Sequence, residues 1–436
     1  MKSKIRNPKS KILIVGAGPA GASLAIRLAK KNFDVTLVER EKFPRQKLCG
    51  EFISPECLSH FKELGVFGEM ISAGGERITE TVFYEPGGNS VSVPSKWFGG
   101  DLQGALGLSR AEMDFRLLEK AKEAGAEVLE EYAAIGLLSG KEGNISGLRF
   151  RTVNGNLKEI TADLIIDATG RARVIAKLAD KNFLTQRRQN NSSNYQVPTT
   201  DHKKEARVNR VRTTNNEQIQ NPKSKIQNRF VGFKAHLENV NLSRGVCEIY
   251  FFRGGYGGLS HVENNFANHC FLIRAEVVKQ CGGDAERIVK EVIFQNKRAF
   301  QTMKDAAPVS EWLAVSVDGF GGKNLNPAKN IFAVGDASAF IDPFTGSGML
   351  MAFEGAEILA EVIAENYLSP ERITEKYQLR HAAKFRKRLR VSALLRRAAF
   401  VPALAKLAIS GLGISAKLRE ILARQTRQPF RTDENK

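Results

Sequence analysis

The feature that most constrains this 436-residue chain is a glycine-rich turn between a strand-like run and a helix-like run. KILIV (11–15) is apolar after its lysine, which is typical of a strand in a parallel sheet. GAGPAG (16–21) follows with GxGxxG spacing, and ASLAIRLAK (22–30) then has its apolar residues at helical spacing. The next strand-like run ends at Glu39. This context predicts a βαβ unit that binds the pyrophosphate of a dinucleotide.

Each glycine of the turn has a role in that interpretation. Gly16 makes the tight turn, Gly18 lets backbone amides approach the pyrophosphate, and Gly21 lets helix and strand pack closely. Glu39 is placed to accept hydrogen bonds from the adenosine ribose, and the helix N-terminus favours phosphate charge. A glycine turn without a ligand is the alternative, which the strand and helix context disfavours. The residues predicted to contact the dinucleotide here are Gly16, Gly18, Ala20, Gly21, Glu39 and Arg40.

A second motif lies in GDASAFIDPFTGSGMLMAFEGA (335–356). A strand predicted over 330–338 brings Asp336 to its carboxyl end, where it can accept hydrogen bonds from ribityl hydroxyls. The amides of Gly346, Gly348 and Met349 begin a long helix, whose dipole can stabilise negative charge on a reduced flavin. Taken alone, the pattern also fits an ordinary strand, loop and helix.

The charge distribution argues against a nucleic-acid-binding core. The net charge is +19, but the segments 1–11, 184–229 and 371–436 carry +5, +7 and +12, so the rest of the chain is slightly acidic. Residues 184–228 are polar and rich in Asn and Gln, so we expect them to be disordered, with a basic arm for an acidic partner as the alternative. We therefore expect a small-molecule partner and no nucleic acid.

Five cysteines without a CxxC pair predict neither a disulfide framework nor a metal site. The N-terminus lacks an apolar signal region, so we expect a cytoplasmic location in which Cys49 is a free thiol. The tail 384–424 alternates basic and apolar residues. It is interpreted either as a peripheral contact with an anionic membrane or as a helical cap on the dinucleotide domain.

Together these motifs resemble the FAD-dependent family of para-hydroxybenzoate hydroxylase, the geranylgeranyl reductases and the flavin halogenases. The resemblance is carried by GAGPAG with Glu39, by Gly335-Asp336, and by three further segments: LSRAEMD (108–114), ATGR (168–171) and FPRQKLCGEFISPECL (43–58). It implies bound FAD, with Arg110 and the backbone near Ala134 contacting the cofactor and Asp336 holding the ribityl chain.

The resemblance also places residues beside the reactive ring of FAD. It implies that Cys49 and Gly50 lie against the isoalloxazine ring, where Cys49 is a candidate contact to flavin or substrate. The alternative for Cys49 is a small buried apolar residue. Phe252 and Tyr256 are predicted to line an apolar substrate pocket, although aromatic residues on strands are often core.

The remaining histidines and acids carry weaker predictions. His261 and Glu263 are candidates for an acid or base, with surface positions as the alternative, and His236 is expected to be structural.

The expected fold is α/β, with a Rossmann-like FAD-binding domain, an inserted antiparallel substrate domain and a helical C-terminal region. The predicted boundaries are 1–75, 103–183 and 325–370 for the FAD-binding domain, 76–102 and 229–324 for the substrate domain, 184–228 for the insertion, and 371–436 for the basic helical region.

The resemblance implies an FAD-dependent oxidoreductase acting on an apolar, aromatic or prenyl-type molecule, as a monooxygenase or a double-bond reductase. No second GxGxxG is present, so NAD(P)H is expected to be a transient electron donor. A flavin halogenase is a less favoured alternative. Halogenases of the tryptophan type carry a WxWxIP segment and a positioned lysine, whereas Trp97 and Trp312 stand alone here, which counts against that subgroup. The further alternative is a flavin-binding protein without turnover.

Overall fold

The computed structural model describes residues 11–99, 104–140, 145–180, 230–400, 409 and 415–425. The insertion that the sequence predicts to be disordered, 184–228, lies outside these residues.

A five-stranded parallel sheet forms the first layer of the molecule, in the order β20-β12-β1-β2-β8. Its strands are β1 (Lys11–Val15), β2 (Asp34–Val38), β8 (Glu127–Leu129), β12 (Leu164–Asp167) and β20 (Ile331–Ala333). Strand β1 is buried on both faces, because Ile12 and Ile14 pack against helices while Leu13 and Val15 pack against a second sheet. This explains the continuous apolar run of its sequence.

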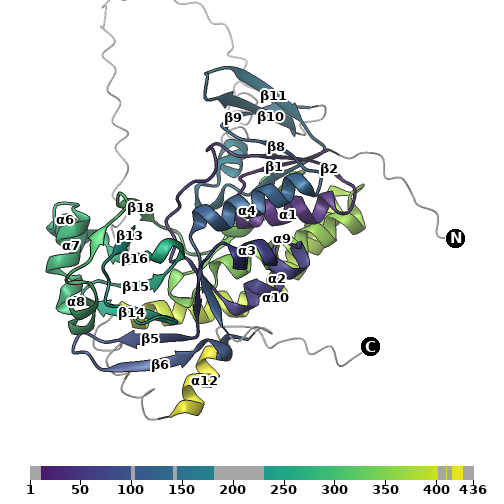
Figure 1. Cartoon of the computed structure of the whole chain (residues 1–436). Helices are drawn as coiled ribbons and strands as arrows, with labels where there is room; N and C mark the ends of the chain where they lie inside the picture. The colour runs from purple at the N-terminus through teal and green to yellow at the C-terminus, as the bar shows by residue number, and fades with distance from the viewer. Residues whose placement is uncertain are drawn as a thin grey trace, which may run out of the picture.

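Helices cover one face of the parallel sheet and an antiparallel meander covers the other (Figure 1). The helices are α1 (Pro19–Ala29), α4 (Arg110–Glu123) and α9 (Gly348–Asn366), and the meander is β9 (Tyr132–Ser139), β10 (Ile145–Thr152) and β11 (Leu157–Thr161). Helices α2 (Pro55–Leu64) and α3 (Phe67–Ser72) pack beside them.

A second, larger sheet stands beside this layer, in the order β17-β13-β16-β15-β14-β5-β6, with β18 also paired to β13. All its pairings are antiparallel except the parallel one between β14 and β5. Its strands are β5 (Glu80–Tyr84), β6 (Ser90–Pro94), β13 (Phe230–Glu238), β14 (Val246–Phe252), β15 (Gly255–His261), β16 (Ala267–Arg274), β17 (Ala307–Pro308) and β18 (Leu313–Val317).

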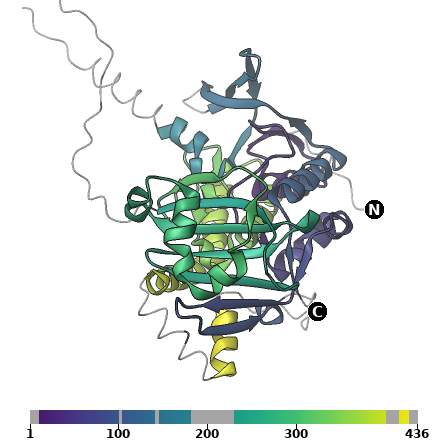
Figure 2. The same ribbon diagram turned by 60° about the vertical axis from the view of Figure 1, so that its left-hand side comes forward.

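The two faces of this larger sheet bury different clusters. The outer face packs on α6 (Ala275–Gln280), α7 (Ala285–Glu291) and α8 (Lys297–Met303) (Figures 1 and 2). The inner face carries Phe230, Phe251 and Tyr256, which pack against Phe340 and Phe344 of the segment before α9. A small sheet of β3 (Phe52–Ile53), β7 (Ala105–Gly107) and β4 (Glu76–Ile78) links the two layers.

The C-terminal region begins with a long helix, α10 (Pro370–Ala399), that packs along α9. The Tyr377 hydroxyl donates to the carbonyl of Ala333 at 2.8 Å, and Arg388 pairs with Glu354 at 2.6 Å. The described start of the tail is therefore a helical cap on the first domain, and α12 (Ala416–Gln425) follows it. Within the described ranges, no helix is long and apolar enough to cross a bilayer. The predicted α/β fold, with a parallel and an antiparallel sheet, is confirmed.

Candidate dinucleotide site

The glycine turn follows β1 at the carboxyl edge of the parallel sheet. Gly16 has φ +104°, and a Cβ there would overlap the carbonyl oxygen of Ala168 at the end of β12. A Cβ at Gly18 would instead have the guanidinium nitrogens of Arg110 and Arg45 as its nearest neighbours, at 3.7 and 4.0 Å. The turn thus presents its backbone between two cations, which is the environment that a pyrophosphate needs.

Glu39 joins the end of β2 to this turn. Its side chain is 6% exposed, and one carboxylate oxygen accepts hydrogen bonds from the Ala17 amide at 3.0 Å and from Arg45 at 3.4 Å. The other oxygen accepts from the Arg40 amide at 3.0 Å. The Arg40 side chain turns outward to pair with Glu41. Arg40 therefore contributes its amide to this corner, whereas its guanidinium faces solvent.

Two arginines flank Gly18, Arg45 buried and Arg110 partly buried, and the carboxylate of Asp114 forms ion pairs with both. Asp114 is fully buried and accepts from Arg45 at 2.9 Å and from Arg110 at 2.6 and 2.8 Å. Burial of Arg110 works to lower its pKa, but Asp114 and then Cys49 outweigh it, so the pKa is raised above the ordinary value. The contacts predicted from the sequence included Arg110 but not Arg45 or Asp114.

Asp336 lies in the turn after β20, where the sequence reading placed it. Burial raises its pKa to about 6, although the nearby cations Arg171 and Arg110 act to lower it. No described residue donates a hydrogen bond to this carboxylate. A desolvated acceptor at the sheet edge fits a ligand that brings its own hydroxyl groups.

The turn that leads into α9 is fixed by Asp342 and Tyr256. Asp342 accepts from the Phe344 amide at 2.9 Å and from the Tyr256 hydroxyl at 2.6 Å. Burial and the adjacent carboxylate raise the pKa of Tyr256 well above its ordinary value, so it stays a hydrogen-bond donor. Gly346 adopts φ +60°, and α9 then begins at Gly348 and Met349 as a 19-residue helix. These predicted contacts therefore lie at a helix N-terminus, where anionic charge is stabilised.

Residues 9–389 match the family model of the FAD binding domain, and this matched region spans most of the chain. The chain belongs to the FAD-binding domain family. The chain is similar to a digeranylgeranylglycerophospholipid reductase of Methanopyrus kandleri, with 26% identity over 359 residues, which are 81% of this chain and 76% of that protein. A flavin-dependent halogenase of Armillaria mellea is 31% identical over 199 residues, 44% of this chain and only 36% of that protein.

Solved structures show the same fold at low sequence identity. A flavin-dependent brominase superposes with a TM-score of 0.70 at 16% identity, over 96% of this chain and 93% of its own. A geranylgeranyl bacteriochlorophyll reductase-like protein of Thermoplasma acidophilum gives 0.68 at 17% identity, over 95% of both chains. A brominase and a reductase-like protein therefore share this fold. The family match and the similarity to a reductase support an FAD-dependent oxidoreductase.

The residues around the turn fit FAD. Gly18 with the amides after it, flanked by Arg45 and Arg110, would hold the pyrophosphate, and Glu39 faces the same corner for the adenosine ribose. Asp336 would accept from the ribityl chain. The family thus matches the chemistry of the donor and acceptor groups present.

Ala134 lies in β9, two residues after Tyr132, whose amide donates to the Glu39 carbonyl at 2.9 Å. Its strand therefore starts beside the predicted ribose corner. Its backbone contact with FAD stays a prediction.

Cys49 and Gly50 lie where the segment after β2 crosses toward the larger sheet. The Cys49 carbonyl accepts from Asn268 of β16 at 3.1 Å, and the thiol interacts electrostatically with Arg110 and Cys270. Cys49 is a partly exposed free thiol, and a Cβ at Gly50 would meet no atom within 4 Å. Cys49 and Gly50 are therefore not part of a packed core. Their partly exposed position leaves room for the flat ring of a flavin.

Phe252 and Tyr256 lie on opposite faces of the larger sheet. Strands β14 and β15 pair Phe252 with Gly255 and Phe251 with Tyr256. Phe252 is buried in the outer cluster under α6 to α8, whereas Tyr256 is in the inner cluster. The structure therefore separates the two predicted pocket residues, and Phe252 is placed as core.

His261 and Glu263, for which surface positions were the alternative, are both buried. His261 Nε2 lies 3.1 Å from the Leu242 carbonyl, and Glu263 accepts from the Ser109 amide at 2.9 Å. Glu263 thus supports the start of α4.

Among the described residues there is no cluster of His, Cys, Asp or Glu suited to a metal ion.

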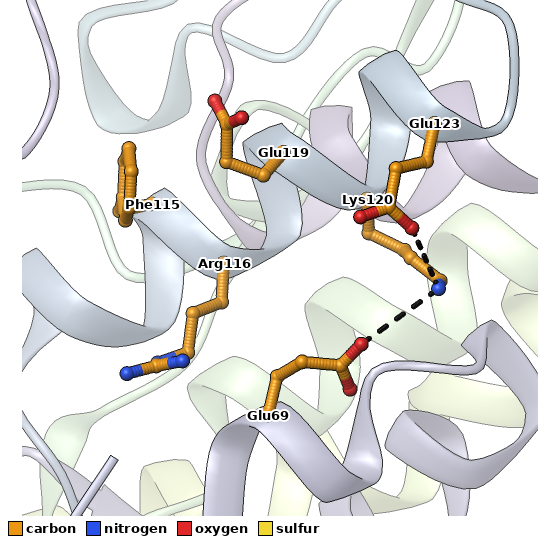
Figure 3. A pocket seen from close by; sticks show the side chains of 6 residues that line it. All are labelled: Glu69, Phe115, Arg116, Glu119, Lys120 and Glu123. Atoms are coloured by element: carbon orange, nitrogen blue, oxygen red, sulfur yellow. Dashed lines mark hydrogen bonds and ion pairs between the residues drawn. The ribbon is translucent and has the colours of Figure 1, made fainter. Parts of the chain in front are cut away.

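Figure 3 shows a pocket between α4 and α3. Lys120 there pairs with Glu123 at 2.9 Å and with Glu69 at 3.8 Å, so its charges are balanced locally. The residues that line it are Glu69, Phe115, Arg116, Glu119, Lys120 and Glu123. None of them is a residue of the FAD site.

Asp336→Asn is expected to stabilise the apoprotein at about pH 7.5 but not at about pH 4. A carboxyl with a folded pKa of about 6, above the ordinary 3.8, binds more protons when folded between these values. Stability therefore falls as pH rises through this window, and the substitution recovers about 1–3 kcal/mol above it. Urea unfolding at both pH values measures the effect, with the exposed Asp305→Asn as the control. An equal gain at both pH values would contradict the raised pKa.

Cys49→Ala is expected to keep a full complement of FAD and to shift the visible spectrum of the bound flavin. The pyrophosphate and ribose contacts lie elsewhere, so loss of one small side chain at a partly exposed position costs little stability. In the wild-type protein, FAD is expected to slow alkylation of Cys49. Equal labelling rates with and without FAD would place Cys49 away from the ring.

Proposed function

We propose that this FAD-dependent oxidoreductase acts on an apolar, prenyl-type or aromatic small molecule, and that its reaction is reduction of a carbon–carbon double bond. The observation that carries the proposal is the composition of the inner sheet face at the start of α9. Aromatic residues from several strands and connecting segments pack together there in a largely buried cluster, namely Phe83, Phe230, Phe251, Tyr256, Phe320, Phe340, Phe344 and Phe400. A substrate that reaches this cluster would meet aromatic side chains, which favours an apolar molecule over a charged one.

The comparison with a prenyl-lipid reductase supports this choice. The Methanopyrus kandleri protein, named a digeranylgeranylglycerophospholipid reductase, aligns over most of both chains. Bound FAD would supply the hydride, taken from a transiently bound NAD(P)H or another donor. The residues of this chain would hold the cofactor, through Arg45, Arg110 and Asp336, and would shield the reacting bond from water.

Oxygenation of the same class of substrate is the second candidate. A squalene monooxygenase of Panax ginseng is 29% identical over 148 residues, which are 33% of this chain. Tryptophan-type halogenation is disfavoured, because Trp312 packs with His269 and Phe271 on the outer sheet face. Lys234 is buried on the inner face, but its ammonium forms an ion pair with Glu51. It is therefore not free to serve as the positioned lysine of those halogenases.

Product analysis separates these reactions. The FAD-loaded protein is incubated with geranylgeraniol and NADPH or NADH, first without oxygen and then with isotopically labelled dioxygen. A gain of two hydrogens without oxygen supports the reductase. Label from dioxygen in the product establishes the monooxygenase and overturns the reductase. A flavin that neither donor bleaches, with no product after chemical reduction, supports a flavin-binding protein without turnover.

A further inference from the structure

The segment that carries Cys49 is fixed to β13 of the larger sheet by side chains on one face of that strand. Gly232, Lys234 and His236 alternate along the strand, so they point to the same face. A Cβ at Gly232 would lie 2.9 Å from Leu48 Cδ2, which shows how closely the segment approaches. The contact joins parts of the chain that are more than 180 residues apart.

The carboxylate of Glu51 is the centre of this contact. Glu51 is fully buried, and one oxygen accepts from the Arg110 amide at 2.8 Å and from the Lys234 ammonium. The other oxygen lies 2.7 Å from His236 Nε2. One side chain therefore connects the Cys49 segment, the first turn of α4 and β13. The side chain of Arg110 itself flanks Gly18.

The Lys234 ammonium directs its hydrogen bonds to the same segment. It is 1% exposed and donates to Glu51, to Gln46 Oε1 at 3.0 Å and to the Lys47 carbonyl at 3.4 Å. A lysine is rarely buried unless it is paired, because its desolvation is costly. Here its donors meet three acceptors within residues 46–51, so the segment has a defined position against the sheet.

The backbone at Glu51 shows that the conformation is imposed. Glu51 has φ +53°, the left-handed region that side chains other than glycine seldom adopt. Such a conformation is strained and persists where surrounding contacts over-determine it. It directs the carboxylate toward β13 while Gly50 and Cys49 border the open side.

We propose that Glu51, Lys234 and His236 are positioning residues that form a latch between the domains and hold Cys49 and Gly50 at the flavin. This proposal depends on FAD binding at the site described above. It does not depend on whether the reaction is a reduction or an oxygenation. FAD would stay anchored through Glu39, the glycine turn and the arginines when the latch is removed. The environment of its ring would then change.

The test replaces both charges with neutral residues of similar size, Glu51→Gln with Lys234→Met. Replacing both partners avoids the isolated buried charge that a single substitution leaves, so the fold and the FAD content are expected to be retained. The visible absorption of FAD is expected to shift. Alkylation of Cys49 in the FAD-loaded protein, followed by mass spectrometry of its peptide, is expected to accelerate about tenfold because the segment opens more often.

The matched control is Glu248→Gln with Arg298→Met. Glu248 is also buried, pairs with Arg298 at 2.6 Å, and belongs to the outer face of the same sheet. This variant is expected to lose stability without changing the flavin spectrum or Cys49 labelling. If the latch variant does not fold, His236→Gln provides the same two measurements with a smaller expected change.

Two results would overturn the proposal. An unchanged spectrum and unchanged Cys49 labelling in the folded latch variant would show that the contact only stabilises the fold. Loss of FAD from that variant would show that the contact belongs to cofactor binding. Neither result depends on catalytic activity, so failure of the latch is distinguishable from failure of the proposed reductase function.

Discussion

Asp114→Asn is expected to destabilise the apoprotein by about 3–5 kcal/mol and to weaken FAD binding at least about 100-fold. The aspartate is fully buried and is the shared partner of Arg45 and Arg110. Removing its charge leaves the buried Arg45 and the partly buried Arg110 under-compensated, which is the costly case for a buried ion pair. The arginines then lose their fixed positions beside Gly18. Urea unfolding of the apoprotein and titration with FAD, followed by flavin fluorescence, measure the two effects.

Glu112→Gln is the matched control for this prediction. Glu112 lies on the same helix and pairs with Arg116 at 3.0 Å, but both side chains are partly exposed. Its loss is expected to cost less than about 1 kcal/mol and to leave FAD binding unchanged. A similar small effect of Asp114→Asn would show that the two arginines do not depend on it.

Much of the parallel domain could be predicted from the sequence because its signals are local. The run 11–40 contains the strand, the turn, the helix and Glu39, and their order alone determines where each lies. The structure brings Glu39 to the turn through the Ala17 amide, as the spacing implies. Asp336 likewise lies in the turn after a predicted strand.

The arginine pair could not be found in the same way. Arg45 and Asp114 are 69 residues apart, and nothing in either local sequence indicates their contact. The partial signal was the i, i+4 spacing of Arg110 and Asp114 on a predicted helix, which favours an ion pair. The ion pair of Glu51 with Lys234 was missed for the same reason, because a buried charge cluster is defined by the packing of two domains. His236 was expected to be structural, but its partner Glu51 could not be predicted.

The separation of Phe252 and Tyr256 could have been predicted. Arg253 and Gly254 form the two-residue connection between β14 and β15, so Phe252 pairs with Gly255. Tyr256 then pairs with Phe251, and adjacent residues of a strand point to opposite faces. The prediction failed because it used the composition of the segment without the register of its hairpin.

Glu39→Lys is expected to lower FAD affinity more than about 100-fold while the protein stays folded. The substitution removes the acceptor at the ribose corner and adds a cation beside Arg45. Glu39 is only 6% exposed, so the variant stays folded if the flexible lysine stem lets the ammonium reach solvent. Glu39→Gln keeps the size and one acceptor oxygen, so its loss of affinity is expected to be smaller, about tenfold, as for a weakened charge-assisted hydrogen bond.

The control for Glu39→Lys is Glu127→Lys, which makes the same change of charge on the adjacent strand β8. Glu127 is exposed and accepts from the Thr36 hydroxyl at 3.0 Å. Its replacement is expected to leave FAD content unchanged, so a general effect of added positive charge is measured separately. Flavin content after gel filtration and near-ultraviolet circular dichroism give occupancy and folding for each variant. A folded Glu39→Lys protein that retains stoichiometric FAD would show that this carboxylate serves the packing of the turn, through Ala17, and does not bind the ribose.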